Sequence, residues 1–196
     1  MTPLLTGVFA SQISGHLTPP FVDNGSMEPI AMVQVGSAGT SYIEFTSIPN
    51  TYKHLQIRGI ARDTWSASGY GEFYVYPNND TTSGVYADHG FYGDGASAGS
   101  YGYSSRSDGM FVGNMVRNGS MGDTFGVFVI DILNYASNTK NKTARSLSGS
   151  DLNGSGTVLF QSALWQSTTP ISSLRITPNG TGFKEYTQIA LYGIKG

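Results

Sequence analysis

The sequence predicts an all-β fold, a single antiparallel β-sandwich that follows an extended N-terminal arm. Short segments in which apolar and polar side chains alternate recur along the chain, as in strands with one buried face. Turn residues such as Gly, Asn and Pro separate these segments at intervals of about 8–15 residues, and no stretch of useful length has a helical period. With 196 residues, the chain is long enough for one sandwich with a full core.

About ten segments carry a strand pattern. In residues 53–62, Leu55 and Ile57 share the apolar face, and Arg62 belongs to the polar face. Residues 123–133 form a continuous apolar run rich in β-branched residues, which is typical of a central strand. The expected strands cover residues 30–35, 40–47, 53–62, 72–76, 110–117, 123–133, 142–149, 157–165, 172–177 and 185–194.

The last two of these segments are predicted to pair with each other. Residues 172–177 and 185–194 flank Asn179-Gly180, a dipeptide typical of tight hairpin turns. In a sandwich the final strand can be a central or paired strand, so its apolar side chains are expected in or near the core. The residues expected to be largely buried are Leu55, Ile57, Phe128, Ile130, Ile132, Leu159, Leu174, Ile176, Ile189 and Leu191.

Residues 77–109 are the least regular part of the sequence. The stretch GDGASAGSYGYSSRSDG, residues 93–109, is so rich in Gly and Ser that it predicts a long loop. Tyrosines set among Gly and Ser are typical of adaptable surfaces that contact sugars or proteins; the alternative is a hydrophobic floor beneath the loop. The candidates for outward or lateral contact are Tyr86, Phe91, Tyr92, Tyr101 and Tyr103.

Residues 1–28 are predicted to form an arm that docks on another molecule, and residues 29–196 to form the sandwich. Pro19 and Pro20 exclude a long helix, and the arm has no Lys or Arg, so it lacks the basic region of a signal peptide. A partner surface could cover its many apolar side chains and pair its backbone. The side chains expected to make this contact are Leu4, Leu5, Val8, Phe9, Ile13, Leu17 and Phe21.

The composition excludes several classes of partner and site. Only 12% of the residues are charged, the net charge is −2, and no basic stripe exists to bind nucleic acid. No apolar run approaches the roughly 20 residues that span a membrane. The chain has no cysteine, which excludes disulfides and zinc-thiolate sites. We therefore expect neither a nucleic-acid partner nor a membrane partner.

Several short motifs resemble active sites or metal sites but lack the necessary context. Residues 95–99 match G-x-S-x-G without the helix that must follow a nucleophile elbow. Residues 151–156 begin like a calcium loop, but its twelfth position is Ser162, so a plain hairpin turn is the simpler interpretation. Asp88 and His89 are neighbours on a strand and would face opposite sides. We expect no catalytic residue, cofactor or metal.

Paired carboxylates are the remaining catalytic candidates, because glycoside hydrolases use two of them. The candidates by location alone are Glu44, Glu72, Asp88 and Asp94.

Four stretches carry a resemblance to a known family: FTSIPNTYKHLQIRGIAR (45–62), DHGFYGDGASA (88–98), VIDILNYASNTKNKTARSLSG (129–149) and TPISSLRITPNGTGFKEYTQIALYGIKG (169–196). They resemble virion proteins of tailed bacteriophages, over roughly residues 40–196. The resemblance implies a jelly-roll-like β-sandwich carried on capsids or tails, commonly as a homotrimer. It brings no catalytic residues with it.

The sequence and the resemblance together predict a non-enzymatic structural protein on the surface of a phage particle. A capsid decoration or cement protein is favoured, because residues 1–28 are too short for the shaft of a fibre. Its arm would contact the major capsid protein, another virion protein or an adjacent subunit. The alternative is a tail-fibre or receptor-binding adhesin whose loops bind a host-surface glycan, and a polysaccharide-degrading enzyme is a third class.

A homotrimer is also expected on physical grounds. The chain has so little charge that its exposed apolar side chains would be better hidden between subunits. The side chains expected there are Trp65, Tyr74, Tyr76 and Phe111.

Overall fold

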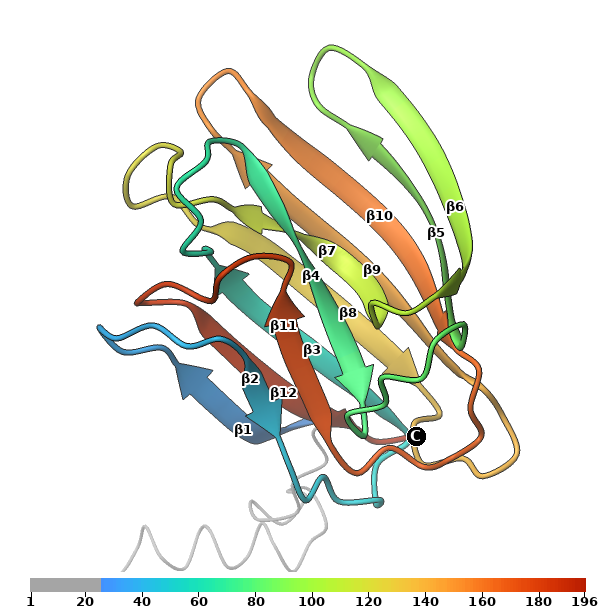
Figure 1. Ribbon diagram of the computed structural model, residues 1–196. Helices are drawn as coiled ribbons and strands as arrows, with labels where there is room; N and C mark the ends of the chain where they lie inside the picture. The colour runs from blue at the N-terminus through green and yellow to red at the C-terminus, as the bar shows by residue number, and fades with distance from the viewer. Residues whose placement is uncertain (1–25) are drawn as a thin grey trace, which may run out of the picture.

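The computed structural model describes residues 26–196, which form twelve strands in two antiparallel sheets and contain no helix (Figure 1). This confirms the predicted all-β sandwich. Because it has no helix, this part of the chain has none that could cross a membrane. The strands are β1 (Met27–Gln34), β2 (Ile43–Phe45), β3 (His54–Ala61), β4 (Tyr70–Pro77), β5 (Tyr86–Gly93), β6 (Ala98–Arg106), β7 (Met110–Val116), β8 (Gly126–Leu133), β9 (Lys142–Asp151), β10 (Gly156–Trp165), β11 (Leu174–Pro178) and β12 (Gln188–Ile194).

The strand order is that of a jelly roll with two additional hairpins. One sheet has the order β1-β12-β3-β8-β9-β10-β5-β6, and the other has the order β2-β11-β4-β7. Without β5, β6, β9 and β10, each sheet keeps four strands, in the orders β1-β12-β3-β8 and β2-β11-β4-β7 of a double Greek key. The hairpins β9–β10 and β5–β6 extend the first sheet on one side.

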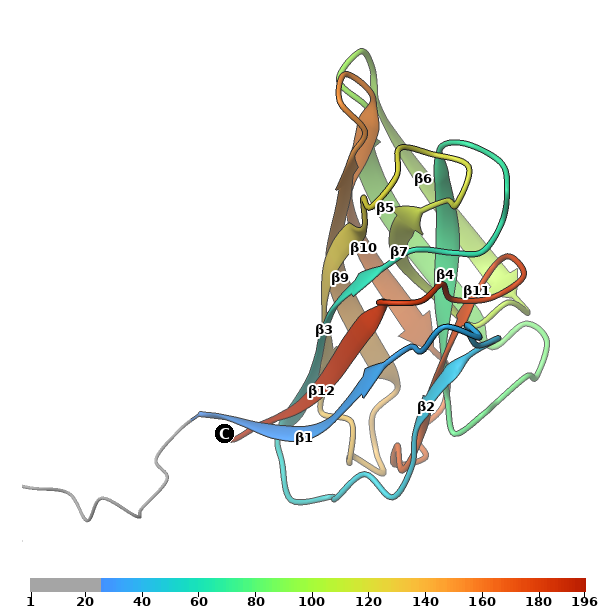
Figure 2. The same ribbon diagram turned by 90° about the vertical axis from the view of Figure 1, so that its left-hand side faces the viewer.

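The eight-stranded sheet extends beyond the four-stranded sheet that packs on it. Figure 1 shows the four-stranded sheet lying over β12, β3 and β8, while β5 and β6 stand at the opposite edge from β1. Figure 2 shows the two layers from the side. The inner face of the β5–β6 hairpin therefore borders the edge strand β7 and is only partly covered.

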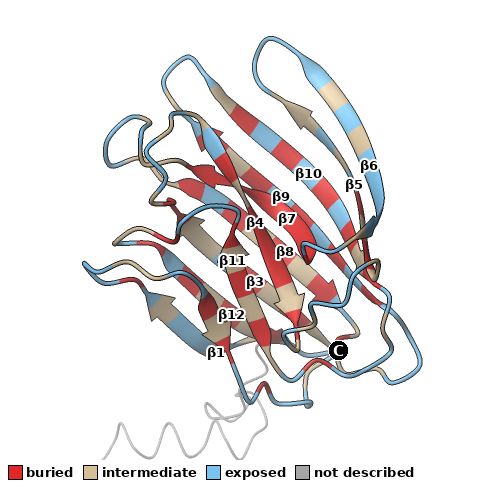
Figure 3. Ribbon diagram, in the orientation of Figure 1, coloured by how far each residue is buried: buried red, intermediate tan, exposed pale blue. Residues whose placement is uncertain are grey.

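The core lies between the two sheets. All ten residues predicted to be buried are buried, and the most exposed of them, Phe128, is 5% accessible. Its ring packs against that of Phe73 from the opposite sheet, with the centroids 4.7 Å apart. Burial alternates along β9 and β10, as Figure 3 shows, because their other face is open to solvent.

The prediction of a long loop over residues 93–109 is wrong, because most of this stretch forms β6. Its glycines lie across from large side chains on β5: Gly90 faces Tyr101, and Gly99 faces Tyr92. A side chain at either glycine would collide with the opposite tyrosine ring, at 2.7–2.8 Å. The rings occupy the space that glycine leaves empty, so a loop-like composition forms a regular strand pair.

The predicted pairing of the last two strands is also wrong. β11 lies between β2 and β4 in one sheet, whereas β12 lies between β1 and β3 in the other. Asn179-Gly180 makes no two-residue hairpin turn, since the segment crosses between layers and inserts the buried ring of Phe183. The final strand is nevertheless paired on both sides, and the prediction that its apolar side chains lie in the core is confirmed for Ile189 and Leu191.

The first described strand begins slightly before the predicted domain. β1 starts at Met27, two residues ahead of position 29, and it is an edge strand paired only with β12. Pro29 is tolerated there because an edge strand has backbone N–H groups that need no partner. The predicted contact residues of the arm, from Leu4 to Phe21, lie outside the described residues.

Candidate functional site

A cleft of about 440 Å³ opens where the β5–β6 hairpin extends past the four-stranded sheet. Its volume falls within the range of about 300–1,000 Å³ that small-ligand sites occupy. Tyr101 and Tyr103 come from β6, and the edge of the other sheet contributes Glu72 from β4 and Phe111 from β7. The full lining is Glu72, Tyr101, Tyr103, Arg106, Asp108 and Phe111.

A β-bulge points Arg106 into this cleft. Tyr86 pairs with Arg106, but two residues along β5, Asp88 pairs with Tyr103, so β6 has one extra residue. Ser105, within the bulge, has a φ of 56°. The extra residue reverses the alternation, and Arg106 therefore shares the inner face with Tyr103.

Arg106 is the centre of the cleft. Its Nη1 atom lies 3.1 Å from Oδ1 of the buried Asp88, and its Nη2 atom donates to the Tyr74 hydroxyl at 3.2 Å. Its Cζ atom lies 5.0 Å from the ring centroid of Tyr103 and 5.7 Å from that of Phe111, within the range of cation–π contacts. The guanidinium is therefore held by the carboxylate of Asp88 and by the rings of Tyr103 and Phe111.

The charges around Arg106 shift the pKa values of their neighbours. Burial raises the pKa of Asp88, and the positive charge of Arg106 offsets this only in part. Burial acts to lower the pKa of Arg106, but the charge of Asp88 and other nearby groups raise it overall. Burial and a 2.5 Å hydrogen bond to Glu72 raise the pKa of the Tyr74 hydroxyl, which keeps it a donor to that carboxylate.

The five aromatic residues predicted to make contacts are divided between different environments. Tyr86 is fully buried, and its hydroxyl donates to the Asp80 backbone carbonyl. Tyr101 and Tyr103 line the cleft, with ring centroids 5.7 Å apart. Tyr92 is half-buried on the same inner side, with its ring against Gly99. Phe91 points the other way and is 59% exposed.

A second surface, the apolar row, crosses the outer face of the eight-stranded sheet. Strand register places Val129 beside Leu147, Leu147 beside Phe160, and Phe160 beside Phe91. Leu147, Phe160 and Phe91 are exposed, and Val129 is half-buried. The rings of Phe91 and Phe160 lie 5.4 Å apart. A groove of about 480 Å³ beside this row is also lined by Val127 and Val158.

The side chains that were predicted to hide between subunits are mostly engaged within the chain. Tyr74 and Phe111 are buried, which contradicts their expected place in an intersubunit surface. Trp65 is partly exposed, and its ring centroid lies 4.2 Å from Cζ of Arg117. The apolar row takes their place as exposed apolar surface, and the alternation of strands β8 to β10 could have identified it.

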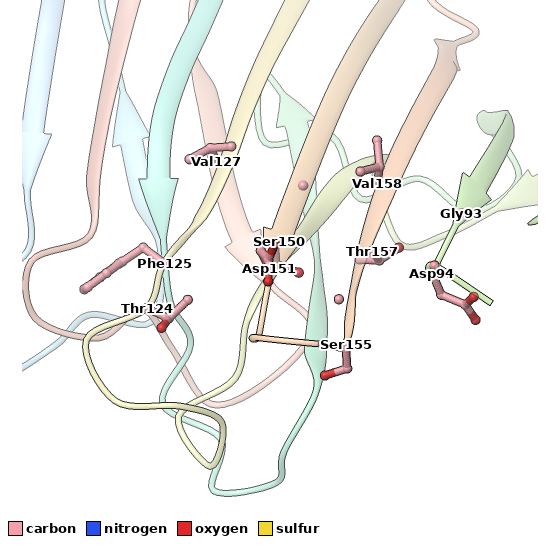
Figure 4. A pocket seen from close by; sticks show the side chains of 14 residues that line it. Gly93, Asp94, Thr124, Phe125, Val127, Ser150, Asp151, Ser155, Thr157 and Val158 are labelled. Atoms are coloured by element: carbon pink, nitrogen blue, oxygen red, sulfur yellow. The ribbon is translucent and has the colours of Figure 1, made fainter. Parts of the chain in front are cut away.

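Another hollow, of about 700 Å³, lies among turns at one end of the sheet (Figure 4). Asp94 and Asp151 lie on opposite sides of it in this view, with Thr157 and Ser155 between them. Asp151 accepts a hydrogen bond from the Asn153 amide at 2.8 Å, which stabilises the β9–β10 turn. Residues 151–156 thus join β9 and β10 as a hairpin, as the sequence predicted.

The carboxylates proposed as catalytic candidates are not all brought together. Glu72 lines the cleft and Asp88 lies buried beneath it, while Glu44 is in the distant edge strand β2 and Asp94 lies at a turn. Asp88 and His89 face opposite sides of β5, as predicted: Asp88 is buried and His89 is exposed. Residues 26–196 contain no cluster of three or more His, Asp or Glu that could hold a metal ion.

Comparisons with protein-family models, curated proteins and solved structures gave no match.

Proposed function

We propose that this protein is a non-enzymatic structural protein of a tailed-phage particle, a capsid decoration or cement protein that assembles as a homotrimer. The observation that carries the assembly part is the apolar row on the outer face of the larger sheet. The four stretches that resemble phage virion proteins support the location. Jelly rolls also serve as shell-building domains of viruses, which is support by analogy of fold.

The apolar row suits an interface between copies of this chain. Its apolar centre is bordered on one side by a polar row in which Asp131 binds both Gln56 and Arg145. An apolar centre with a polar rim is the usual composition of a protein interface. In a cyclic trimer each subunit presents two different surfaces, and the apolar row is one of them.

Replacing Leu147 with glutamate is expected to convert the trimer into monomers, because a charge would be buried at the centre of the interface. Sedimentation at micromolar concentration should give three times 20.9 kDa for the natural chain and 20.9 kDa for the variant. Met121→Glu, at an exposed loop position away from this face, is the control and should remain trimeric. A natural chain that sediments only as a monomer contradicts the proposal.

The arm is proposed to attach the sandwich to the major capsid protein or another virion protein. Deleting residues 1–24 leaves every described strand intact, so the truncated protein should fold but no longer join particles. Particle binding can be measured by co-sedimentation and by electron microscopy of labelled protein. Full occupancy of the particle by the truncated protein would place the anchor elsewhere.

The second candidate is a tail-fibre or receptor-binding adhesin. One observation favours it, namely the aromatic cleft beside β7, although its residues lie on strands rather than on the predicted loops. Lectin domains are also built on jelly rolls. Labelled protein found only at the tail, rather than over the shell, would favour this candidate over the first.

A further inference from the structure

We propose that the cleft lined by Tyr101, Tyr103, Arg106, Glu72 and Asp108 binds a short neutral saccharide. The inference concerns the purified chain and does not depend on whether the protein sits on a capsid or a tail. It names a site, a ligand class and the residues that make contact.

The aromatic side of the cleft offers flat apolar surface to a sugar ring. Tyr103 is 54% exposed, and Tyr101 lies between it and Phe111, with ring centroids 5.7 and 6.1 Å away. Tyr101 and Phe111 are fixed in place, because Tyr101 packs over Gly90 and Phe111 is buried. The Tyr103 ring is supported by Tyr101 and by the guanidinium of Arg106. A fixed ring loses little conformational entropy when a ligand packs its C–H face against it.

The polar side of the cleft offers both acceptors and a donor. The contacts of Asp108, to Arg106 and to the Ser107 hydroxyl, are 3.5 and 3.4 Å long, beyond the usual range of about 2.7–3.2 Å. Its carboxylate can therefore accept hydrogen bonds from ligand hydroxyl groups. The donor is the hydroxyl group of the exposed Tyr103. Charge-assisted hydrogen bonds of this kind are the stronger ones.

The charges of the cleft select against ionic ligands. Three carboxylates, Glu72, Asp88 and Asp108, surround the single cation Arg106, so phosphates and acidic sugars would be repelled. An aromatic cage can bind an organic cation, but here the guanidinium of Arg106 already occupies the rings. A neutral ligand rich in hydroxyl groups satisfies the acceptors without either conflict.

The test is a glycan array followed by calorimetric titration of the full chain with neutral and acidic oligosaccharides. Neutral glycans should bind, and Tyr103→Ala should weaken binding by about tenfold or more through lost ring contact. Asp108→Ala should weaken binding as well. Tyr42→Ala, which removes an exposed ring just before β2, at the edge of the four-stranded sheet opposite β7, should leave binding unchanged.

Three results would overturn the inference. If no neutral oligosaccharide binds at millimolar concentration, the inference is wrong. A preference for acidic glycans would contradict it as well. Equal binding by Tyr103→Ala and the natural chain would place the sugar elsewhere. Because Tyr103 and Asp108 are solvent-exposed, both variants should fold, and unchanged thermal unfolding of each variant verifies this. Particle attachment is measured separately, so failure of one proposal leaves the other standing.

Discussion

Replacing Arg62 with methionine is expected to lower the free energy of unfolding by about 3 kcal/mol, because several backbone carbonyls lose a charged donor together. Arg62 is 2% exposed. Its Nη1 atom donates to the carbonyls of Met121 and Thr124, at 2.8 and 3.0 Å, and its Nη2 atom donates to those of Asn118 and Ser120, at 3.0 and 3.1 Å. One guanidinium thus holds the loop between β7 and β8.

The measurement is chemical denaturation of the natural chain and two comparison variants. Arg62→Lys keeps the charge but has three donors on a single nitrogen, so we expect a smaller loss. Arg58→Met, at an exposed position on β3, the strand that ends just before Arg62, should change the free energy of unfolding by less than about 0.5 kcal/mol. If Arg62→Met and Arg58→Met unfold at the same denaturant concentration, the four hydrogen bonds do not stabilise the fold.

Ile130→Ala is expected to lower the free energy of unfolding by about 2–5 kcal/mol, because it removes buried methyl groups and leaves a cavity. Ile130 is fully buried in β8, between Ile57 on β3 and Ser146 on β9. β8 is a central strand, so its backbone is held on both sides and cannot easily move to fill the space.

The control for this prediction is on the same strand. Val127→Ala changes an outward-facing side chain that is mostly exposed, and we expect a cost below about 1 kcal/mol. Ile130→Val, which removes one methyl group, should lie between the two at about 0.5–1.5 kcal/mol. A cost for Ile130→Ala below about 0.5 kcal/mol would contradict its place in the core. Thermal unfolding followed by circular dichroism suffices to rank the three variants.

Periodicity predicted the core well because burial of one sheet face imposes a repeat of two residues on the chain. Leu55 and Ile57 on β3, and Ile189 and Leu191 on β12, were assigned correctly from this repeat alone. The repeat could not show which strands would pair, so β11 and β12 were wrongly joined. That choice depends on the layers, which no local pattern encodes.

The cleft was only half predictable for related reasons. Tyr101 and Tyr103 attract attention by composition, but Arg106 reaches the same face only through a bulge. Glu72 and Phe111 come from the other sheet, on β4 and β7, the strands that precede and follow the hairpin in sequence. Arg62 looked like a solvent-facing residue at the end of an alternating strand, because the loop that buries it comes much later in the chain.

The β5–β6 hairpin leaves and rejoins the sandwich at adjacent points, since Val75 near the end of β4 pairs with Met110 at the start of β7. An insertion whose ends already meet adds surface without disturbing the strands on either side. Mutations can therefore lengthen the hairpin, replace its aromatic residues or alter its bulge, while the strand pairing of the jelly roll stays the same. Related chains could therefore diversify what they hold at this edge while their shared framework, and whatever it assembles with, stays constant.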